Sequence, residues 1–292
     1  MTTVRIATET DVGLPDGRTL HVYDIPPGEA DTRLTVLWHH GTPNTGEPPE
    51  PLLAASSRLG VRWVGFDRPG YGGSTPHPGR TVGSVADDAA AVADALDVER
   101  FAVMGHSGGG PHVLACAALL PRRVIAAVSI SGLAPFDAVE LDWFAGINAS
   151  GTAELRAATR GRAALERTLA DGDYDPEMFT PADHAALEND QAWLMTVVRR
   201  GGANGPGPMV DDDLAAVSPW GFDPSEISAP VLILHGEQDR VVPVDHGRWL
   251  AGTCPSSQLR TGPDDGHISI LNSAHTALDW LIEVADAAAS QP

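Results

Sequence analysis

Lysine is absent from this sequence, and all 19 of its basic residues are arginine. Schiff-base chemistry, including the attachment of pyridoxal phosphate, needs a lysine amine and is therefore excluded. Cysteine is scarce: Cys116 and Cys254 lie far apart, and neither has the close Cys or His spacing of a zinc site or a redox pair. We therefore expect two inert thiols and predict no metal and no other cofactor.

Long apolar runs and an excess of positive charge are also missing. No apolar run approaches the roughly 18 residues that span a bilayer, and the first residues, MTTVRIATET, lack the pattern of a secretory signal. We therefore expect a cytoplasmic protein. The net charge of −20 repels phosphate backbones and anionic membranes, so neither nucleic acid nor a membrane is an expected partner. The oligomeric state is left open.

The sequence does contain an alternation of short strand-like and helix-like segments. Apolar, β-branched and aromatic residues form the strand-like runs, which Pro, Gly and Asp separate, and helical periodicity marks the others. The strands are expected over 18–24, 33–40, 61–67, 100–105 and 124–131, and the helices over 84–97 and 110–120. Such alternation predicts an α/β fold with a mainly parallel, doubly wound sheet flanked by helices.

This alternation stops after Gly132 and resumes near residue 230 with two further strands and two helices. The residues between read as helical pieces, such as 152–172 and 181–200, joined by the Gly/Pro-rich segment GGANGPGP. A helical insertion in the sheet domain accounts for this pattern. We predict a core formed by residues 1–133 and 229–292 and an inserted helical lid formed by residues 134–228.

A serine flanked by glycines lies at one of the strand-to-helix junctions. Gly105, Ser107 and Gly109 satisfy Gly-x-Ser-x-Gly, a pattern that this composition produces by chance about 0.2 times. The junction makes the match informative, because a nucleophile elbow places its serine between a strand and a helix, where flanking glycines leave room for both. There the Ser107 hydroxyl is lifted out of the sheet, at the positive end of the helix.

Four segments follow one another in a recognisable order. They are HHGTPNTG, FDRPGYGGS, GHSGGGP, and GEQDRVVP followed by DDGHISI. Together they resemble the α/β-hydrolase superfamily, and most of all its branch with a helical lid after the sixth strand. The resemblance covers nearly the whole chain from about Arg18 and implies an α/β-hydrolase fold.

At pH 7 a serine needs a neighbouring base to act as a nucleophile. We expect His267 to be this base, because it lies in a Gly/Asp-rich loop before the last helix and its counterpart in the family has this role. Asp239 is expected to orient the imidazole, and the order Ser, Asp, His is the one this fold uses. Two rivals for the acid remain: Asp245 falls in a predicted helix, and Asp137 lies where some relatives place the acid.

A tetrahedral intermediate needs hydrogen-bond donors, and by analogy with the family these are the backbone NH groups of Thr42 and Gly108. Pro43 has no NH. Ligand sites are mostly apolar and lie between domains, so aromatic residues near the entrance and in the lid are candidates for substrate binding. These are Tyr71, Trp143, Trp193, Trp220 and Phe222. The segment MVDDDLA, residues 209–215, is expected to be a solvated acidic turn.

The leading hypothesis is a serine hydrolase that cleaves a carboxylic ester, lactone or related acyl bond of a small molecule through an acyl-enzyme. An apolar acyl or alcohol group is expected in the substrate. Dehalogenases and epoxide hydrolases of this fold attack with an aspartate, where this chain has Ser107. A perhydrolase or haloperoxidase side reaction would use the same triad.

Three alternatives stay open. The first is a peptidase of the proline iminopeptidase type, although these enzymes carry HGGPG where this chain has HGTPN. They also need an acidic lid site for a free amine, for which Glu188 or Asp190 are available but not singled out. The others are a ligand-binding protein of the same fold and a non-hydrolytic acyltransferase or lyase.

Overall fold

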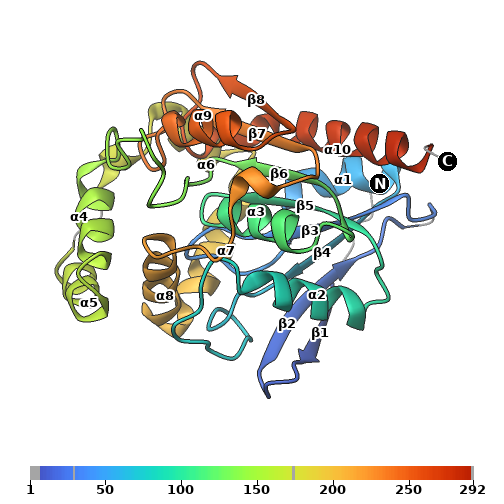
Figure 1. Ribbon diagram of the computed structural model, residues 1–292, viewed down its shortest axis with the longest axis horizontal. Helices are drawn as coiled ribbons and strands as arrows, with labels where there is room; N and C mark the ends of the chain where they lie inside the picture. The colour runs from blue at the N-terminus through green and yellow to red at the C-terminus, as the bar shows by residue number, and fades with distance from the viewer. Residues whose placement is uncertain (1–6, 29, 173–174, 291–292) are drawn as a thin grey trace.

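An eight-stranded sheet with helices on both faces forms the centre of the computed structural model, which describes residues 7–28, 30–172 and 175–290 (Figure 1). The strand order is β1-β2-β4-β3-β5-β6-β7-β8. The strands are β1 (Thr8–Gly13), β2 (Thr19–Ile25), β3 (Leu34–His39), β4 (Val61–Phe66), β5 (Phe101–His106), β6 (Val124–Ile130), β7 (Val231–Gly236) and β8 (Ser257–Gly262). The pairs β1–β2 and β2–β4 are antiparallel and the other five neighbouring pairs are parallel, which confirms the predicted, mainly parallel sheet.

Two apolar layers, one on each face of the sheet, hold the helices in place. The first lies under α2 (Val85–Ala95), α3 (Gly109–Leu119) and α9 (Val244–Thr253). The second lies under α1 (Glu50–Leu59) and α10 (Ala274–Ala289). Strands β3, β5 and β7 are buried along their whole length, because helices cover both of their faces. The sheet is thus doubly wound, as the sequence predicts.

The first strand and the first helix are not among the elements expected from the sequence. Strand β1, TETDVG, is almost entirely exposed, so no apolar run marks it; its pairing with β2 holds it in the sheet. Helix α1 begins within the proline-rich segment 48–51, and it buries only Leu52 and Ser56. Both elements carry too little apolar periodicity to be recognised from the sequence.

Helices also fill the chain between β6 and β7, where the insertion was predicted. They are α4 (Ala149–Ala158), α5 (Arg162–Asp171), α6 (Pro181–Glu188), α7 (Trp193–Gly201) and α8 (Gly207–Ala216). Helices α4, α5 and α8 share a small apolar cluster and lie together at one end of the molecule (Figure 1). Among the described helices, none is both long and apolar enough to cross a bilayer. The boundaries at 134 and 228, and a role as a lid, stay predictions.

The segment 209–215 corrects the sequence analysis. It belongs to α8 instead of forming a solvated turn, and Asp211, Asp212 and Asp213 are each only 7–8% exposed. Arginines from the sheet domain, described below, neutralise the first two aspartates. An acidic run looks solvated in a sequence because the sequence does not show which cations the fold brings to it.

Candidate active site

Ser107 occupies the tight turn between β5 and α3. Its φ of 54° lies in the left-handed region, which is uncommon for a residue other than glycine. The turn is fixed by the Ser107 NH, which donates to the Ile130 carbonyl at 2.8 Å, and by the Ser107 carbonyl, which accepts from the Gly110 NH at 2.8 Å. The side chain is therefore presented at the carboxyl ends of the parallel strands, beside the N-terminus of α3.

The glycines around Ser107 are required by the backbone that packs against them. A Cβ on Gly105 would lie 2.8 Å from the His39 carbonyl oxygen and 2.8 Å from that of Gly109. A Cβ on Gly109 would overlap the His39 carbonyl oxygen. The end of β3 thus approaches the turn so closely that only glycine fits at these two positions, which explains the motif in physical terms.

The structure brings Ser107, His267 and Asp239 together in one hydrogen-bonded chain. The Ser107 Oγ lies 2.9 Å from His267 Nε2, and His267 Nδ1 lies 2.8 Å from Asp239 Oδ2. Because a carboxylate can only accept, Nδ1 carries the proton and Nε2 is free to accept the serine proton. The two other candidates for the acid, Asp137 and Asp245, do not contact the imidazole, because His267 Nδ1 is hydrogen-bonded to Asp239.

Backbone amides fix the Asp239 carboxylate. Its Oδ1 accepts from the NH groups of Val241 and Val242, both at 2.8 Å, which leaves Oδ2 for His267. Burial opposes the ionisation of Asp239, but the adjacent His267 outweighs it and lowers the pKa of Asp239. The carboxylate is therefore ionised at neutral pH and can stabilise an imidazolium.

The loop that carries His267 is held by Asp183 of α6, a residue that sequence analysis missed. Its Oδ1 accepts from the NH groups of Ile268 and Ser269, both at 2.8 Å, and its Oδ2 accepts from the His267 NH at 3.3 Å. A Cβ on Gly266 would overlap this carboxylate. Asp183 also closes a capping box with Thr180, a local signal that sequence reading could have found.

The two predicted oxyanion donors lie side by side near Ser107. A Cβ on Gly108 would lie 3.4 Å from the Thr42 nitrogen and 2.5 Å from Thr42 Oγ1. In the described residues, neither the Thr42 NH nor the Gly108 NH donates a hydrogen bond to a backbone carbonyl. Both amides are therefore available to a substrate oxygen.

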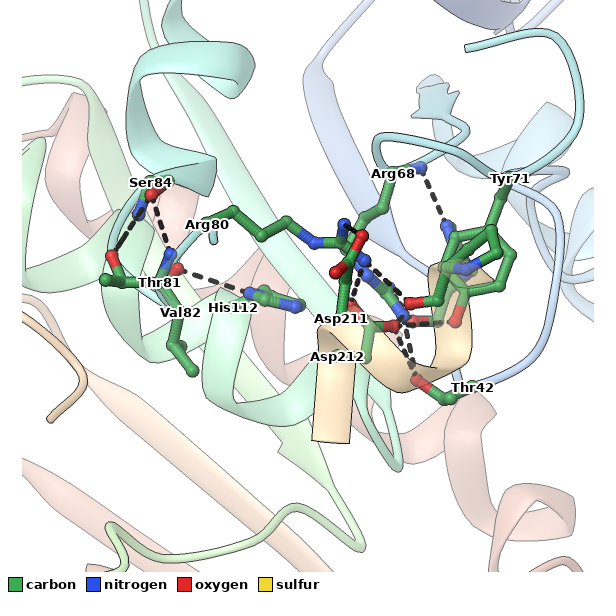
Figure 2. A network of polar contacts seen from close by, with 12 residues as sticks. Thr42, Arg68, Tyr71, Arg80, Thr81, Val82, Ser84, His112, Asp211 and Asp212 are labelled. Atoms are coloured by element: carbon green, nitrogen blue, oxygen red, sulfur yellow. Dashed lines mark hydrogen bonds and ion pairs between the residues drawn. The ribbon is translucent and has the colours of Figure 1, made fainter. Parts of the chain in front are cut away.

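Behind Thr42, the buried carboxylate of Asp212 joins α8 to the sheet domain (Figure 2). Its Oδ2 accepts from Thr42 Oγ1 at 2.8 Å, from Tyr71 Oη at 2.9 Å and from Arg68 Nη2 at 2.7 Å. Its Oδ1 accepts from Arg80 Nη2 at 2.7 Å. Burial opposes the charge, but the two arginines hold the pKa of Asp212 well below its usual range. We call these five residues the Asp212 network.

Arg68 extends the Asp212 network to the backbone of the loop after β3. Its guanidinium donates to the carbonyls of His40 and Gly41, and its backbone NH donates to His40 Nε2 at 2.9 Å. His40 Nδ1 in turn donates to the Gly41 carbonyl at 2.7 Å. His40 therefore shapes the loop that presents Thr42, as the sequence analysis expects, while the part played by Arg68 was missed.

A cavity of about 230 Å³ lies over Ser107 and between the sheet domain and the inserted helices. Its wall is mostly apolar, and its polar side chains are those of Thr42, Ser107, His112, Asn148, Glu154, Asp212 and Asp213. Within the described residues, no group of three or more His, Cys, Asp or Glu side chains is arranged to hold a metal ion.

The five aromatic residues predicted to bind substrate are not among the described residues that line this cavity, which corrects that expectation. Tyr71 is fully buried and bonded to Asp212. Trp143 packs edge-on against Phe136 and Phe144. The remaining three fill gaps in the packing: Trp193 against Trp38, and Trp220 against Phe222. Packing between helices and sheet uses large apolar side chains, and the four residues other than Tyr71 contact such neighbours. Trp193 also borders a surface groove away from Ser107.

Comparisons with known proteins agree with this architecture. The family model described as the alpha/beta hydrolase fold matches residues 35–274. A non-heme chloroperoxidase of Streptomyces lividans is 30% identical over 241 residues, which cover 78% of this chain and 81% of that protein. A bifunctional esterase/perhydrolase of Acinetobacter calcoaceticus is 29% identical over 258 residues, covering 86% and 90%. A thermophilic esterase of Thermogutta terrifontis superposes with a TM-score of 0.70 at 21% identity, covering 96% and 100%. The chain belongs to the alpha/beta hydrolase fold family.

Proposed function

We propose that this protein is a serine hydrolase that cleaves a carboxylic ester, lactone or related acyl bond through an acyl-enzyme. One observation carries the proposal: the chain of hydrogen bonds from Ser107 through His267 to Asp239, at 2.9 Å and 2.8 Å. The similarity to an esterase/perhydrolase and to other hydrolases of this family supports it.

In the proposed reaction, Ser107 Oγ attacks the substrate carbonyl carbon while His267 Nε2 takes the hydroxyl proton. Asp239 stabilises the resulting imidazolium. When the tetrahedral intermediate collapses, the bond to the leaving oxygen breaks and His267 returns the proton to that oxygen. A water molecule, deprotonated by His267, then attacks the acyl-enzyme and releases the acid and free Ser107.

The negative charge of each tetrahedral intermediate would be met by the NH groups of Thr42 and Gly108. A donor of this kind contributes about 2.7–4 kcal/mol to transition-state stabilisation. The Asp212 network supports this role, because it fixes Thr42 through its side chain and the preceding loop through Arg68.

The substrate is proposed to be a small molecule with an apolar acyl or alcohol group. Support comes from the mostly apolar wall of the cavity, with Val82, Leu133, Leu155, Met178 and Met209 among its members. We propose that residues 134–228 act as a lid over this cavity, since α4 and α8 contribute to its wall. A cytoplasmic location completes the proposal, and fractionation of cells that express the tagged chain tests it.

Labelling with a fluorophosphonate probe tests the proposed nucleophile. We expect intact-mass analysis to show one adduct per chain in the wild type and none in Ser107→Ala or His267→Ala. Ser150→Ala, a change on the inserted helix α4, serves as a matched control that keeps the adduct. A folded wild type that takes no adduct, or a Ser107→Ala variant that is still labelled, would refute the proposal.

A second candidate reaction is perhydrolysis, in which hydrogen peroxide replaces water in the attack on the acyl-enzyme. The named activities of the two curated relatives, a chloroperoxidase and an esterase/perhydrolase, favour it. The peroxide oxygen bonds to the acyl carbon, the bond to Ser107 Oγ breaks, and a peracid leaves. Peracid release from an acetate ester in the presence of hydrogen peroxide, lost in Ser107→Ala, would establish this reaction.

A further inference from the structure

Three consecutive aspartates on α8 have different partners. Asp211 pairs with Arg80 at 3.2 Å and with Arg162 of α5, while Asp212 takes both Arg68 and Arg80. The next residue, Asp213, has no arginine partner within the described residues, although it is equally buried at 8% exposed. Two of the three aspartates are therefore neutralised by the protein itself, and the third is not.

Asp213 lies against a second acid, Glu154 of α4. The two carboxyl groups are close enough to influence each other's ionisation, and both line the cavity over Ser107. In the described part of the chain, no NH or OH group donates to the buried Oδ2 of Asp213. Its carboxyl neighbour can donate only when it holds a proton. An unneutralised pair of acids thus faces the space that a substrate would fill.

Among the described residues, the elements packed around this pair offer it no cation. From α3, His112 lines the same cavity, but burial lowers its pKa to about 3, so it is neutral, and its Nδ1 lies 3.3 Å from the Val82 carbonyl. On α4 itself, the guanidinium of Arg156 stacks over the Phe144 ring instead. Arg68, Arg80 and Arg162 are all bonded to Asp211 or Asp212, as described above.

Burial raises the pKa of both acids, and the proximity of Glu154 raises that of Asp213 further. Two neighbouring carboxylates cannot both be ionised without repelling each other, so they share a proton or attract a cation. A pair of acids that has no arginine partner and lines a cavity is arranged for a cationic group of a ligand.

We propose that Glu154 and Asp213 bind a protonated amino group of the substrate and so determine its specificity. This inference rests on the proposed hydrolase function, because it names the substrate class of the same cavity. A primary ammonium has three NH donors, enough for both carboxylates at once. When it enters, the proton shared by the two acids is released to solvent and the cation takes its place.

The two acids considered from the sequence for an amine site, Glu188 and Asp190, are not among the described residues that line the cavity over Ser107. Glu188, at the end of α6, is exposed, and Asp190 borders a different surface groove beside α1 and α7. Only the tertiary structure joins α4 to α8 over Ser107.

Isothermal titration calorimetry with butylammonium and with butan-1-ol, which have the same chain length, tests the site directly. We expect the wild type to bind butylammonium about ten to a hundred times more tightly than butan-1-ol, as for hydrogen bonds to charged groups. A released proton will make the measured heat depend on the ionisation enthalpy of the buffer. Equal affinity for both probes, or no binding of butylammonium, overturns the proposal.

Two variants test whether butylammonium binds at the acid pair. They are Glu154→Gln on α4 and Asp213→Asn on α8. Each is expected to remove the preference for butylammonium, while Glu188→Gln, the same change of charge outside the cavity, retains it. Circular dichroism and fluorophosphonate labelling show whether each variant folds. If one variant does not fold, the other still decides, and an unchanged preference in a folded variant overturns the proposal.

Inhibition kinetics test the amine site at Glu154 and Asp213 separately from the proposed serine hydrolase activity. With 4-nitrophenyl butyrate as a neutral substrate, butylammonium should inhibit competitively in the wild type and about tenfold or more weakly in Asp213→Asn. Hydrolysis without competition by butylammonium overturns the amine site and leaves the hydrolase intact. Binding of butylammonium by a wild type that neither hydrolyses the ester nor takes the fluorophosphonate overturns the hydrolase and leaves the amine site.

Discussion

The residues around Ser107 show how single positions create the chemistry. A left-handed φ at Ser107 and glycines at 105 and 109 place the hydroxyl beside His267, while backbone amides hold Asp239 Oδ1 and direct Oδ2 to the imidazole. Proton transfer along Ser107, His267 and Asp239 depends on which atom of each hydrogen bond donates and which accepts. Changes that keep the shape and alter only the donor pattern are therefore the sharpest tests.

Asp239→Asn is such a change. The asparagine amide would donate toward His267 Nδ1 and so favour the tautomer with its proton on Nε2, which cannot accept the Ser107 proton. We expect kcat for a 4-nitrophenyl ester to fall by about 10⁴, with little change in stability. Asp245→Asn, at an exposed residue of α9, should retain wild-type kcat. A kcat within tenfold of wild type in Asp239→Asn would contradict the assignment.

At the scale of elements, the inserted helices do more than cover the sheet. Asp183 of α6 holds the loop of His267, and Asp212 of α8 holds the loop of Thr42. The base and one oxyanion donor are therefore each fixed by a carboxylate from the insertion. Displacement of these helices would disturb both at once.

Asp183→Ala should show whether Asp183 positions the catalytic base His267 or contributes to substrate binding. Without the carboxylate, the NH groups of Ile268 and Ser269 lose their acceptor and the His267 loop can shift. We expect kcat to fall by about ten- to a hundredfold while KM changes little, because a misplaced base affects the transition state most. Asp183→Asn retains one acceptor oxygen and should recover part of the loss. Equal effects of alanine and asparagine, or a change in KM alone, would argue against positioning.

Asp212→Asn tests the Asp212 network. The change leaves the guanidiniums of Arg68 and Arg80, which are 1% and 3% exposed, without their shared carboxylate. Breaking a buried pair in this way costs about 3–5 kcal/mol, which urea unfolding will measure. Asp94→Asn removes the partner of Arg123 at an exposed site and should cost at most about 1 kcal/mol. Similar losses in the two variants would show that the network contributes no more than a surface pair.

For the whole molecule, the dominant electrostatic feature besides the net charge of −20 is a set of buried neutral histidines. Burial lowers the pKa of His106 and His112 to about 3 and that of His246 to about 4. Unfolding exposes these rings to water and restores a pKa near 6.5. Between these values the unfolded chain binds more protons than the folded one, so stability falls as the pH falls.

Burial lowers the pKa of His39, His40 and His235 as well. Since each neutral histidine contributes about 1.4 kcal/mol at the lower pH, we expect these rings to decrease the free energy of unfolding by about 4–8 kcal/mol between pH 7.5 and pH 5.5. Carboxyls whose pKa burial raises act in the opposite direction and reduce the total; they are Asp67, Asp88, Glu154 and Asp213. Urea titrations monitored by tryptophan fluorescence at the two pH values will measure the difference. Stability that is constant or higher at pH 5.5 would contradict this account.

The sequence by itself determined the fold class, the strand and helix alternation, and the strained turn at Ser107, because these follow from local periodicity and turn chemistry. The resemblance to the α/β-hydrolase superfamily, which the ordered segments carry, also pointed to His267 and Asp239, and the structure joins them to Ser107. These signals lie within short stretches of chain, where residue type and spacing decide the conformation.

Only the tertiary structure decided what the polar and aromatic residues of the insertion do. Asp212 meets Thr42 across 170 positions of sequence, and Glu154 meets Asp213 from another helix. The predicted aromatic wall became packing, and the predicted solvated turn became a buried acidic helix. Ionisation and burial depend on which distant groups the fold brings together, and no local pattern in the chain records that pairing.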